Sequence, residues 1–178
     1  SSDPYAQAVL DKIYDDANDL IAGADVVPER MAMQLLAPDS GNAGISISAN
    51  GVSYVYNYDP DGEWKSANYT ALTTGDLWSA SSTCDPLRDI LAMQDKIEDN
   101  TGARPDVAIM SRTTFNYLLK ADKVRSAILA QNPTANIFLT DAVVKAAISA
   151  ILGVNIVVYN KKFKKEDGTT AAFYPDNY

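Results

Sequence analysis

The stretch D-P-L-R-D-I-L-A-M-Q-D-K-I-E-D-N-T-G-A-R-P-D-V-A-I-M-S, residues 85–111, predicts one helix that leads into one buried strand. Asp85 is suited to the N-cap, because its carboxylate can accept hydrogen bonds from the free backbone N–H groups of the first turn. Gly102 is suited to the residue after the helix, where the backbone takes positive φ. The apolar run V-A-I-M at 107–110 is typical of a strand covered on both faces. The stretch therefore predicts a packed α/β layer, with Ser111 as the cap of a further helix.

The composition indicates a folded chain of one generous domain or two small ones. The 178 residues are 47% hydrophobic and 21% charged, which is enough apolar material for a core. The net charge of −8 makes nucleic-acid binding an unexpected main role, since phosphate backbones repel an acidic chain. No run approaches the roughly 18 apolar residues of a membrane span.

The residue types that are missing narrow the chemistry. The chain has no histidine, which excludes histidine-based triads and histidine-ligated zinc. Its single cysteine, Cys84, has no partner for an internal disulfide and is interpreted as a half-buried, inert thiol. No phosphate-binding loop and no nucleophile motif occurs, and acidic pairs such as Asp15–Asp16 and Glu98–Asp99 fit solvated helix faces. We therefore expect no enzyme activity, no cofactor and no metal site.

The first third of the chain predicts two helical segments and a hairpin. Apolar residues repeat at helical spacing from Leu10 to Ile21, Gly23 ends or bends that helix, and Pro28 starts a second segment. The buried side of this second segment is expected to consist of Met31, Leu35 and Leu36.

Residues 45–58 change to the alternating pattern of strands, and Asn50-Gly51 is a strong hairpin signal. An isolated hairpin is marginally stable in water, so this one must lie on another part of the chain or extend the sheet of another subunit. Residues 59–84 follow as a long surface excursion anchored by Trp64 and Trp78. Such a loop can bind a ligand or simply connect two packed parts.

The remainder predicts helices and short strands in a regular order. These are helices at 112–120 and 122–130, a polar loop at 131–136, a helix capped by Thr140, a buried strand at 154–159, a turn at 165–168 and a returning strand at 170–174. The only basic cluster consists of Lys161, Lys162, Lys164 and Lys165. These lysines form either a solvated edge that resists aggregation or a contact with an acidic neighbouring subunit.

Several stretches, taken in order, carry a family resemblance. They are E-R-M-A-M-Q-L-L at 29–36, the hairpin to Tyr58, Trp78 with D-P-L-R-D-I, the strand G-A-R-P-D-V-A-I-M-S leading into T-F-N-Y-L-L, and the late stretches I-L-G-V-N-I-V-V-Y and F-Y-P-D-N. Their order and spacing resemble the major capsid proteins of tailed bacteriophages, specifically the phage major capsid protein E family.

The resemblance implies an α+β fold, that of the tailed-phage major capsid proteins, in a truncated form. Residues 1–84 would be part of the peripheral domain with its spine helices, residues 85–160 the axial domain, and residues 161–178 a returning hairpin. The implied role is a structural subunit of an icosahedral phage or prophage capsid, self-assembling with copies of itself into pentamers and hexamers around DNA. Scaffold and portal proteins are further implied partners, whereas no membrane and no specific nucleic-acid sequence is expected.

The resemblance also implies a place and a set of contacts. The protein would be made in the bacterial host cytoplasm and would reside in the virion capsid. Family members are longer, so we expect this chain to be a core without the arm and extended loop, soluble as a monomer or small oligomer. A loop aimed at the capsomer centre and the basic cluster are the predicted subunit contacts: Asn132, Pro133, Asn136, Phe138, Lys161, Lys162, Lys164 and Lys165.

Two other function classes stay open at the level of sequence. One is a non-catalytic sugar- or protein-binding module that uses the Trp64–Trp78 loop. The other is a hydrolase that works with carboxylates alone, which would need two acidic side chains facing each other across a cleft.

Overall fold

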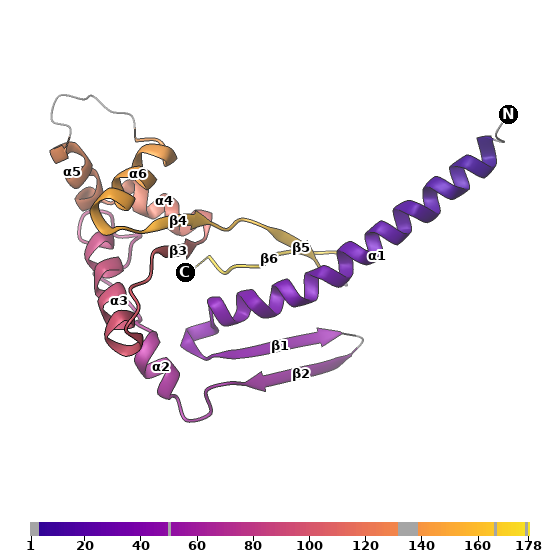
Figure 1. Ribbon diagram of the computed structural model, residues 1–178, viewed down its shortest axis with the longest axis horizontal. Coiled ribbons are helices and arrows are strands. Elements are labelled where there is room, and N and C mark those ends of the chain that lie inside the picture. Colours follow the sequence, from indigo (N-terminus) through magenta and orange to yellow (C-terminus); the bar gives the residue numbers. More distant parts are fainter. Residues whose placement is uncertain (1–3, 50, 132–138, 166, 177) are drawn as a thin grey trace.

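The computed structural model describes residues 4–49, 51–131, 139–165, 167–176 and 178. Figure 1 shows a helical body at one end and a long helix that extends away from it. The elements are α1 (Pro4–Leu36), a short 3-10 turn (Asp39–Gly41), β1 (Gly44–Ala49), β2 (Val52–Asn57), α2 (Glu63–Asn68), α3 (Pro86–Thr101), β3 (Val107–Met110), α4 (Arg112–Lys120), α5 (Asp122–Gln131), α6 (Asp141–Leu152), β4 (Asn155–Val158), β5 (Lys162–Lys164) and β6 (Thr170–Ala172).

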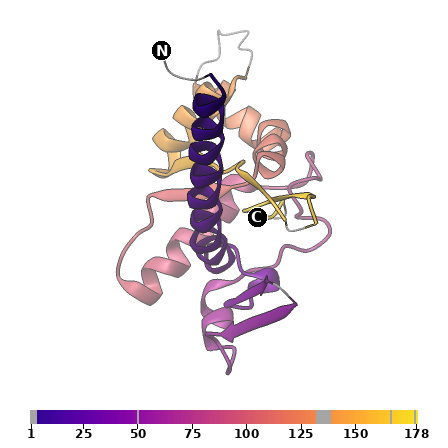
Figure 2. The same cartoon turned by 90° about the vertical axis from the view of Figure 1, so that its right-hand side faces the viewer.

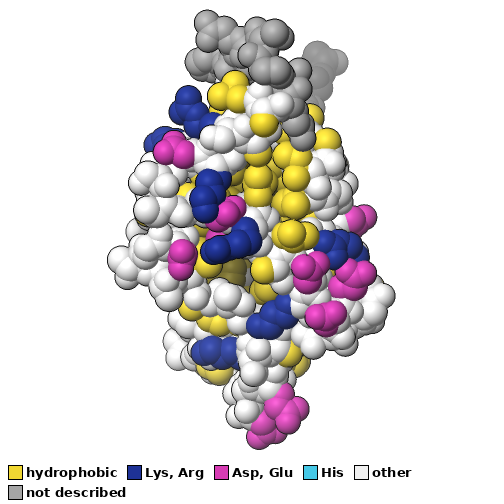
Figure 3. All heavy atoms as spheres, turned by 90° about the vertical axis from the view of Figure 1, so that its left-hand side faces the viewer, with side chains coloured by type: hydrophobic (Ala, Val, Ile, Leu, Met, Phe, Trp, Pro, Cys, Tyr) yellow, Lys and Arg dark blue, Asp and Glu magenta, His cyan; other side chains and the backbone are white. Residues whose placement is uncertain are grey.

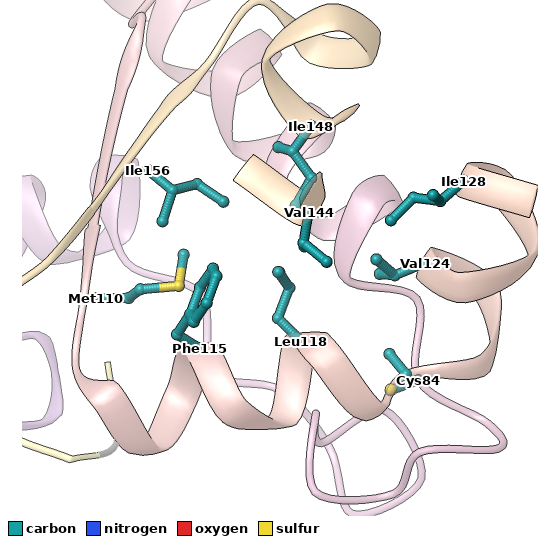
Figure 4. Close-up of a cluster of buried hydrophobic side chains, with 10 residues drawn as sticks. Cys84, Met110, Phe115, Leu118, Val124, Ile128, Val144, Ile148 and Ile156 are labelled. Atoms are coloured by element: carbon teal, nitrogen blue, oxygen red, sulfur yellow. The ribbon is translucent and has the colours of Figure 1, made fainter. Parts of the chain in front are cut away.

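The body consists of α3 to α6 around the parallel pair β3–β4. Val107 pairs with Asn155 and Met110 pairs with Val158, so the two strands run in register over four residues each. Figure 4 shows the core side chains pointing toward one another, with Met110 of β3 and Ile156 of β4 facing side chains from the surrounding helices. The fully buried members of this cluster are Cys84, Phe115, Leu118, Ala121, Val144 and Ile148. Burial of these side chains is the main stabilising contribution to the body.

The predicted helix signals of the body are confirmed. The side chains of Asp85, Ser111 and Thr140 each accept a hydrogen bond from the backbone N–H three residues later, at 3.0–3.3 Å. Gly102 and Gly153 follow α3 and α6 with φ of 72° and 69°, values that side chains with a Cβ rarely adopt. The boundaries of these helices are therefore set by local chemistry that is visible in the sequence.

The two predicted N-terminal segments are a single helix, which corrects the sequence interpretation. α1 runs from Pro4 to Leu36 through both Gly23 and Pro28. The backbone carbonyl that Pro28 leaves without a helical partner is that of Ala24, and both residues are exposed, so water can satisfy it. The predicted buried side is wrong for the two leucines, because Leu36 is 55% exposed and Leu35 is exposed as well, whereas Met31 is half-buried. Packing at the helix end involves Ala37 instead.

The predicted hairpin is confirmed and lies along α1. β1 and β2 are antiparallel, with Ile45 opposite Tyr56 and Ile47 opposite Tyr54. Ile45 and Ile47 are buried where α1 packs on β1, whereas every residue of β2 is exposed. A second antiparallel hairpin, β5–β6, also confirms the prediction for the C-terminal part.

Two further expectations need correction. Residues 59–84 are not wholly irregular, because they contain α2. The strands of the body are not covered on both faces, since Val107 and Val157 are about half exposed. Among the described residues this sheet consists of β3 and β4 alone, so each strand has a free edge. No helix among the described residues is long and apolar enough to cross a membrane.

Leu118→Ala is expected to lower the free energy of unfolding by about 3 kcal/mol, because the side chain is fully buried and its removal leaves a cavity. Leu129→Ala is the matched control, since Leu129 lies in the adjacent helix with 43% of its surface exposed, and should cost less than about 1 kcal/mol. Urea unfolding of the purified chain measures both values. Equal losses at the two positions would contradict this description of the core.

Candidate functional site

The C-terminal residue joins the loop after α1 to the body. The hydroxyl of Tyr178 donates a hydrogen bond to the carbonyl of Pro38 and accepts one from the backbone N–H of Gly41 at 3.3 Å. Its backbone carbonyl accepts a hydrogen bond from the N–H of Ser111, which lies between β3 and α4, at 3.1 Å. One residue thus connects the end of α1 to the start of α4.

Three more tyrosines extend this junction. The ring of Tyr178 lies 6.5 Å from that of Tyr69 and 6.4 Å from that of Tyr174, which in turn lies 6.4 Å from Tyr159. The hydroxyl of Tyr174 donates to the carbonyl of Ile109 in β3 at 2.9 Å. Burial raises the pKa of Tyr174 to about 12, so the hydroxyl keeps its proton even in moderately alkaline solution and acts as a structural donor.

The loop after α1 passes so close to this cluster that it requires glycine. Gly41 has a φ of +76°, and a Cβ placed on it would lie 2.4 Å from a ring atom of Tyr69. No side chain fits at that distance, so position 41 fixes how the hairpin β1–β2 leaves α1.

A charged contact joins α1 to the C-terminal hairpin. The carboxylate of Glu29 accepts hydrogen bonds from the hydroxyl of Tyr159 and from the ammonium group of Lys161. Lys161 is the largest cause of the lowered pKa of Glu29, and Tyr159 is the next. The neighbouring Arg30 guanidinium lies 4.7 Å from the ring centroid of Phe163. From its place inside α1, Glu29 thus connects this helix to the C-terminal part of the chain.

The eight predicted subunit contacts divide into two groups. Asn132, Pro133, Asn136 and Phe138 lie outside the described residues. Lys161 pairs with Glu29 of its own chain. The other lysines of the cluster are exposed and form no ion pair within the described ranges: Lys162, Lys164 and Lys165. The assignment of all eight to subunit contacts stays a prediction.

The two edges of the hairpin β1–β2 differ. On the outer edge of β1, the side-chain amide of Gln34 accepts a hydrogen bond from the N–H of Ser46 at 2.7 Å and donates to its carbonyl at 2.9 Å. The sequence offered no signal for this role of Gln34. On the outer edge of β2, no comparable partner is found among the described residues. The large side chains of β2 and the residue after it are 50–71% exposed: Val52, Tyr54, Val55, Tyr56 and Tyr58.

Exposed apolar side chains also occur at both ends of the molecule. Figure 1 shows the N-terminal half of α1 extending away from the other elements, and Figure 2, viewed from that end, shows the helix in front of them. Val9, Ile13 and Tyr14 are exposed there. Figure 3 shows an apolar stripe running down the face of the body between charged groups. The helices at this end, α3 and α6, carry the exposed residues Leu91 and Ile151. Contiguous exposed apolar surface is typical of a protein that binds other proteins.

The candidate binding and reactive residues of the sequence are engaged in the fold. The indole N–H of Trp78 donates to Asp89 at 3.0 Å, and its ring packs against the core. Trp64 is partly exposed in a groove beside α3. Cys84 is fully buried rather than half-buried, and burial, followed by the charge of Asp89, raises the pKa of its thiol. No group of three acidic or cysteine side chains that could hold a metal occurs in the described part of the chain.

Comparison with known proteins finds one matching family and solved structures with a similar fold. Residues 3–178 match the model of the family described as phage major capsid protein E. A phage-related protein from Bordetella bronchiseptica RB50 shares 15% identity and a TM-score of 0.57, over 89% of this chain and 42% of that one. A protein described as a candidate capsid protein of a prophage in Escherichia coli CFT073 shares 21% identity and a TM-score of 0.52, over 85% of this chain and 42% of that one.

The two structural similarities are limited both in length and in sequence identity. The aligned part makes up less than half the length of each of the two solved chains. At these identities the likeness shows the fold alone. No curated protein matches the chain.

Glu29→Gln is expected to lower the urea midpoint at neutral pH, with an effect that disappears in acid. A carboxyl group whose pKa is lower in the folded state stabilises the fold above its unfolded pKa, and this contribution is lost as the pH falls through the folded pKa. The difference between wild type and variant should therefore shrink below pH 4.5. Asp25→Asn, at an exposed position of the same helix, is the control and should change little at either pH. A difference for Glu29→Gln that is constant with pH would contradict the assignment.

Proposed function

The chain belongs to the phage major capsid protein E family, and on this premise we propose that it is a subunit of an icosahedral phage or prophage shell that assembles with copies of itself. The observation that carries the proposal is the family match over residues 3–178, together with a fold shared with a candidate prophage capsid protein. The family supports a structural role in a capsid.

The distribution of apolar surface supports self-assembly. The body has a closed core, but the N-terminal half of α1, the strand β2 and the face of α3 and α6 all expose large apolar side chains. An isolated chain would expose these surfaces to water, whereas a closed shell would cover them with neighbouring subunits. Such contacts need no catalytic group.

The finer features of the proposal concern partners and location. We propose pentamers and hexamers as the capsomers, with scaffold and portal proteins as further partners. The protein would be made in the bacterial cytoplasm and would end in the virion capsid. Its net charge of −8 suits a shell around packaged DNA, because an acidic lining does not grip phosphates.

The alternative binding module receives less support. Trp78, one of its two aromatic residues, has its polar group bound to Asp89 and its ring against the core. This leaves Trp64 as the aromatic residue available to a ligand in the loop, with part of its surface exposed. The loop thus serves as a connector that is anchored to α3.

Negative-stain electron microscopy of the complete product of the gene that encodes this chain tests the proposal. The expected result is uniform shells or capsomer rings, with or without the scaffold protein of the same phage. Sedimentation of the purified product measures the same property in solution. A product that stays monomeric under all conditions, including added scaffold, would contradict the shell function.

A further inference from the structure

The strand β2 presents a free edge with unused backbone groups. Gln34 binds both the N–H and the carbonyl of Ser46, so these groups point away from β2. Val55 is the residue opposite Ser46. In an antiparallel ladder, two residues that face each other either both point their backbone N–H and C=O groups toward each other or both point them outward. The backbone groups of Val55 therefore point away from β1. By the same alternation, Ser53 and Asn57 also face the open edge.

The usual protection of a free edge is missing here. Natural sheets prevent their edge strands from pairing with other chains by means of lysine, proline, bulges or a covering element. Residues 43–58 contain no charged residue and no proline. The β1–β2 ladder runs without a bulge from Gly44 opposite Asn57 to Ala49 opposite Val52. An edge with exposed Val and Tyr side chains and no such device is suited to pairing with another strand.

We propose that the outer edge of β2 pairs with the same edge of a second copy of this chain, antiparallel and centred on Val55. In this arrangement Val55 lies opposite Val55 of the partner, and Ser53 lies opposite the partner's Asn57. Each of these pairs exchanges two backbone hydrogen bonds. If the pairing were centred on Tyr54 or Tyr56 instead, one of the outward-facing residues Ser53, Val55 and Asn57 would have no outward-facing partner opposite it.

The side chains are complementary in this register. Tyr54 lies opposite the partner's Tyr56, and Val52 lies opposite the partner's Tyr58. Aromatic and β-branched residues that face each other across strands stabilise a pair by roughly 0.2–1 kcal/mol each. Tyr54 and Tyr56 share a face with the buried Ile45 and Ile47, so the new pairs extend an existing apolar layer.

Charge supports a second copy as the occupant. Two chains of net charge −8 repel each other, and an uncharged segment is a place where they can approach without opposed carboxylates. The result is an isologous contact about a two-fold axis, which closes after two subunits. The inference rests on the proposed function, because a shell supplies copies of the chain as partners.

Disulfide formation in the purified 178-residue chain tests the register. Val55→Cys is expected to give a covalent dimer on mild oxidation, because directly paired residues have Cα atoms about 5.5 Å apart, within the disulfide range. The native Cys84 is fully buried and does not compete. Val55 is 71% exposed, so the substitution leaves the core intact.

Ser53→Cys and Asn57→Cys are the matched controls on the same edge. In the proposed register, each of these positions lies about 13 Å along the strand from its own symmetry mate. Neither variant alone should form the dimer, whereas a mixture of the two should. Failure of Val55→Cys to form a dimer, or equal dimer formation by all three single variants, would overturn the inference.

A charge exchange gives a second, non-covalent readout. Val55→Lys and Val55→Glu each place like charges opposite each other and should weaken dimer formation about fivefold in sedimentation equilibrium. An equal mixture of the two should recover it. Recovery would support the two-fold contact, and no recovery would overturn it. If shells form but Val55→Cys gives no disulfide dimer, the β2 contact is contradicted and the shell function is not. If the dimer forms but shells do not, only the shell function is contradicted.

Discussion

The position of α1 depends on a small set of hydrogen bonds at its C-terminal end. Tyr178 binds Pro38 and Gly41 after the helix, and Glu29 binds Lys161 and Tyr159. Because α1 is long and is fixed near one end, a small change of angle there displaces its far end by a larger distance. The junction therefore determines where the hairpin β1–β2 and the N-terminal half of α1 lie relative to the body.

The hydrogen bonds at the end of α1 lie between two parts of the molecule that differ in how much apolar surface they bury. The body is stable through its own core, in which Phe115, Leu118 and Ile148 are fully buried. On the other side of the junction, Ile45 and Ile47 are buried against α1, but β2 is exposed throughout and α1 extends away from the body. In the proposed shell, neighbouring subunits would cover this remaining apolar surface, which agrees with membership of a capsid protein family.

The sequence predicts the elements whose signals are local. Caps such as Asp85 and Thr140, glycines such as Gly102, and the Asn50-Gly51 turn depend on nearby backbone chemistry, and the helices and hairpin they mark are confirmed where described. The errors concern tertiary context. Pro28 lies inside a helix whose exposed side tolerates it, and α2 forms without a strong apolar pattern. The roles of Gln34 and Tyr178 depend on partners that are distant in the sequence, so no local pattern could reveal them.

In the proposed shell, surfaces left open in the single chain are covered by other copies. Hydrogen exchange of β2, compared between the isolated chain and assembled shells, tests it most directly. We expect fast exchange of the Ser53, Val55 and Asn57 amides in the chain diluted until it is monomeric and strong protection in shells, while Met110 in the body stays protected in both. Equal exchange of these β2 amides in the two states would contradict the account.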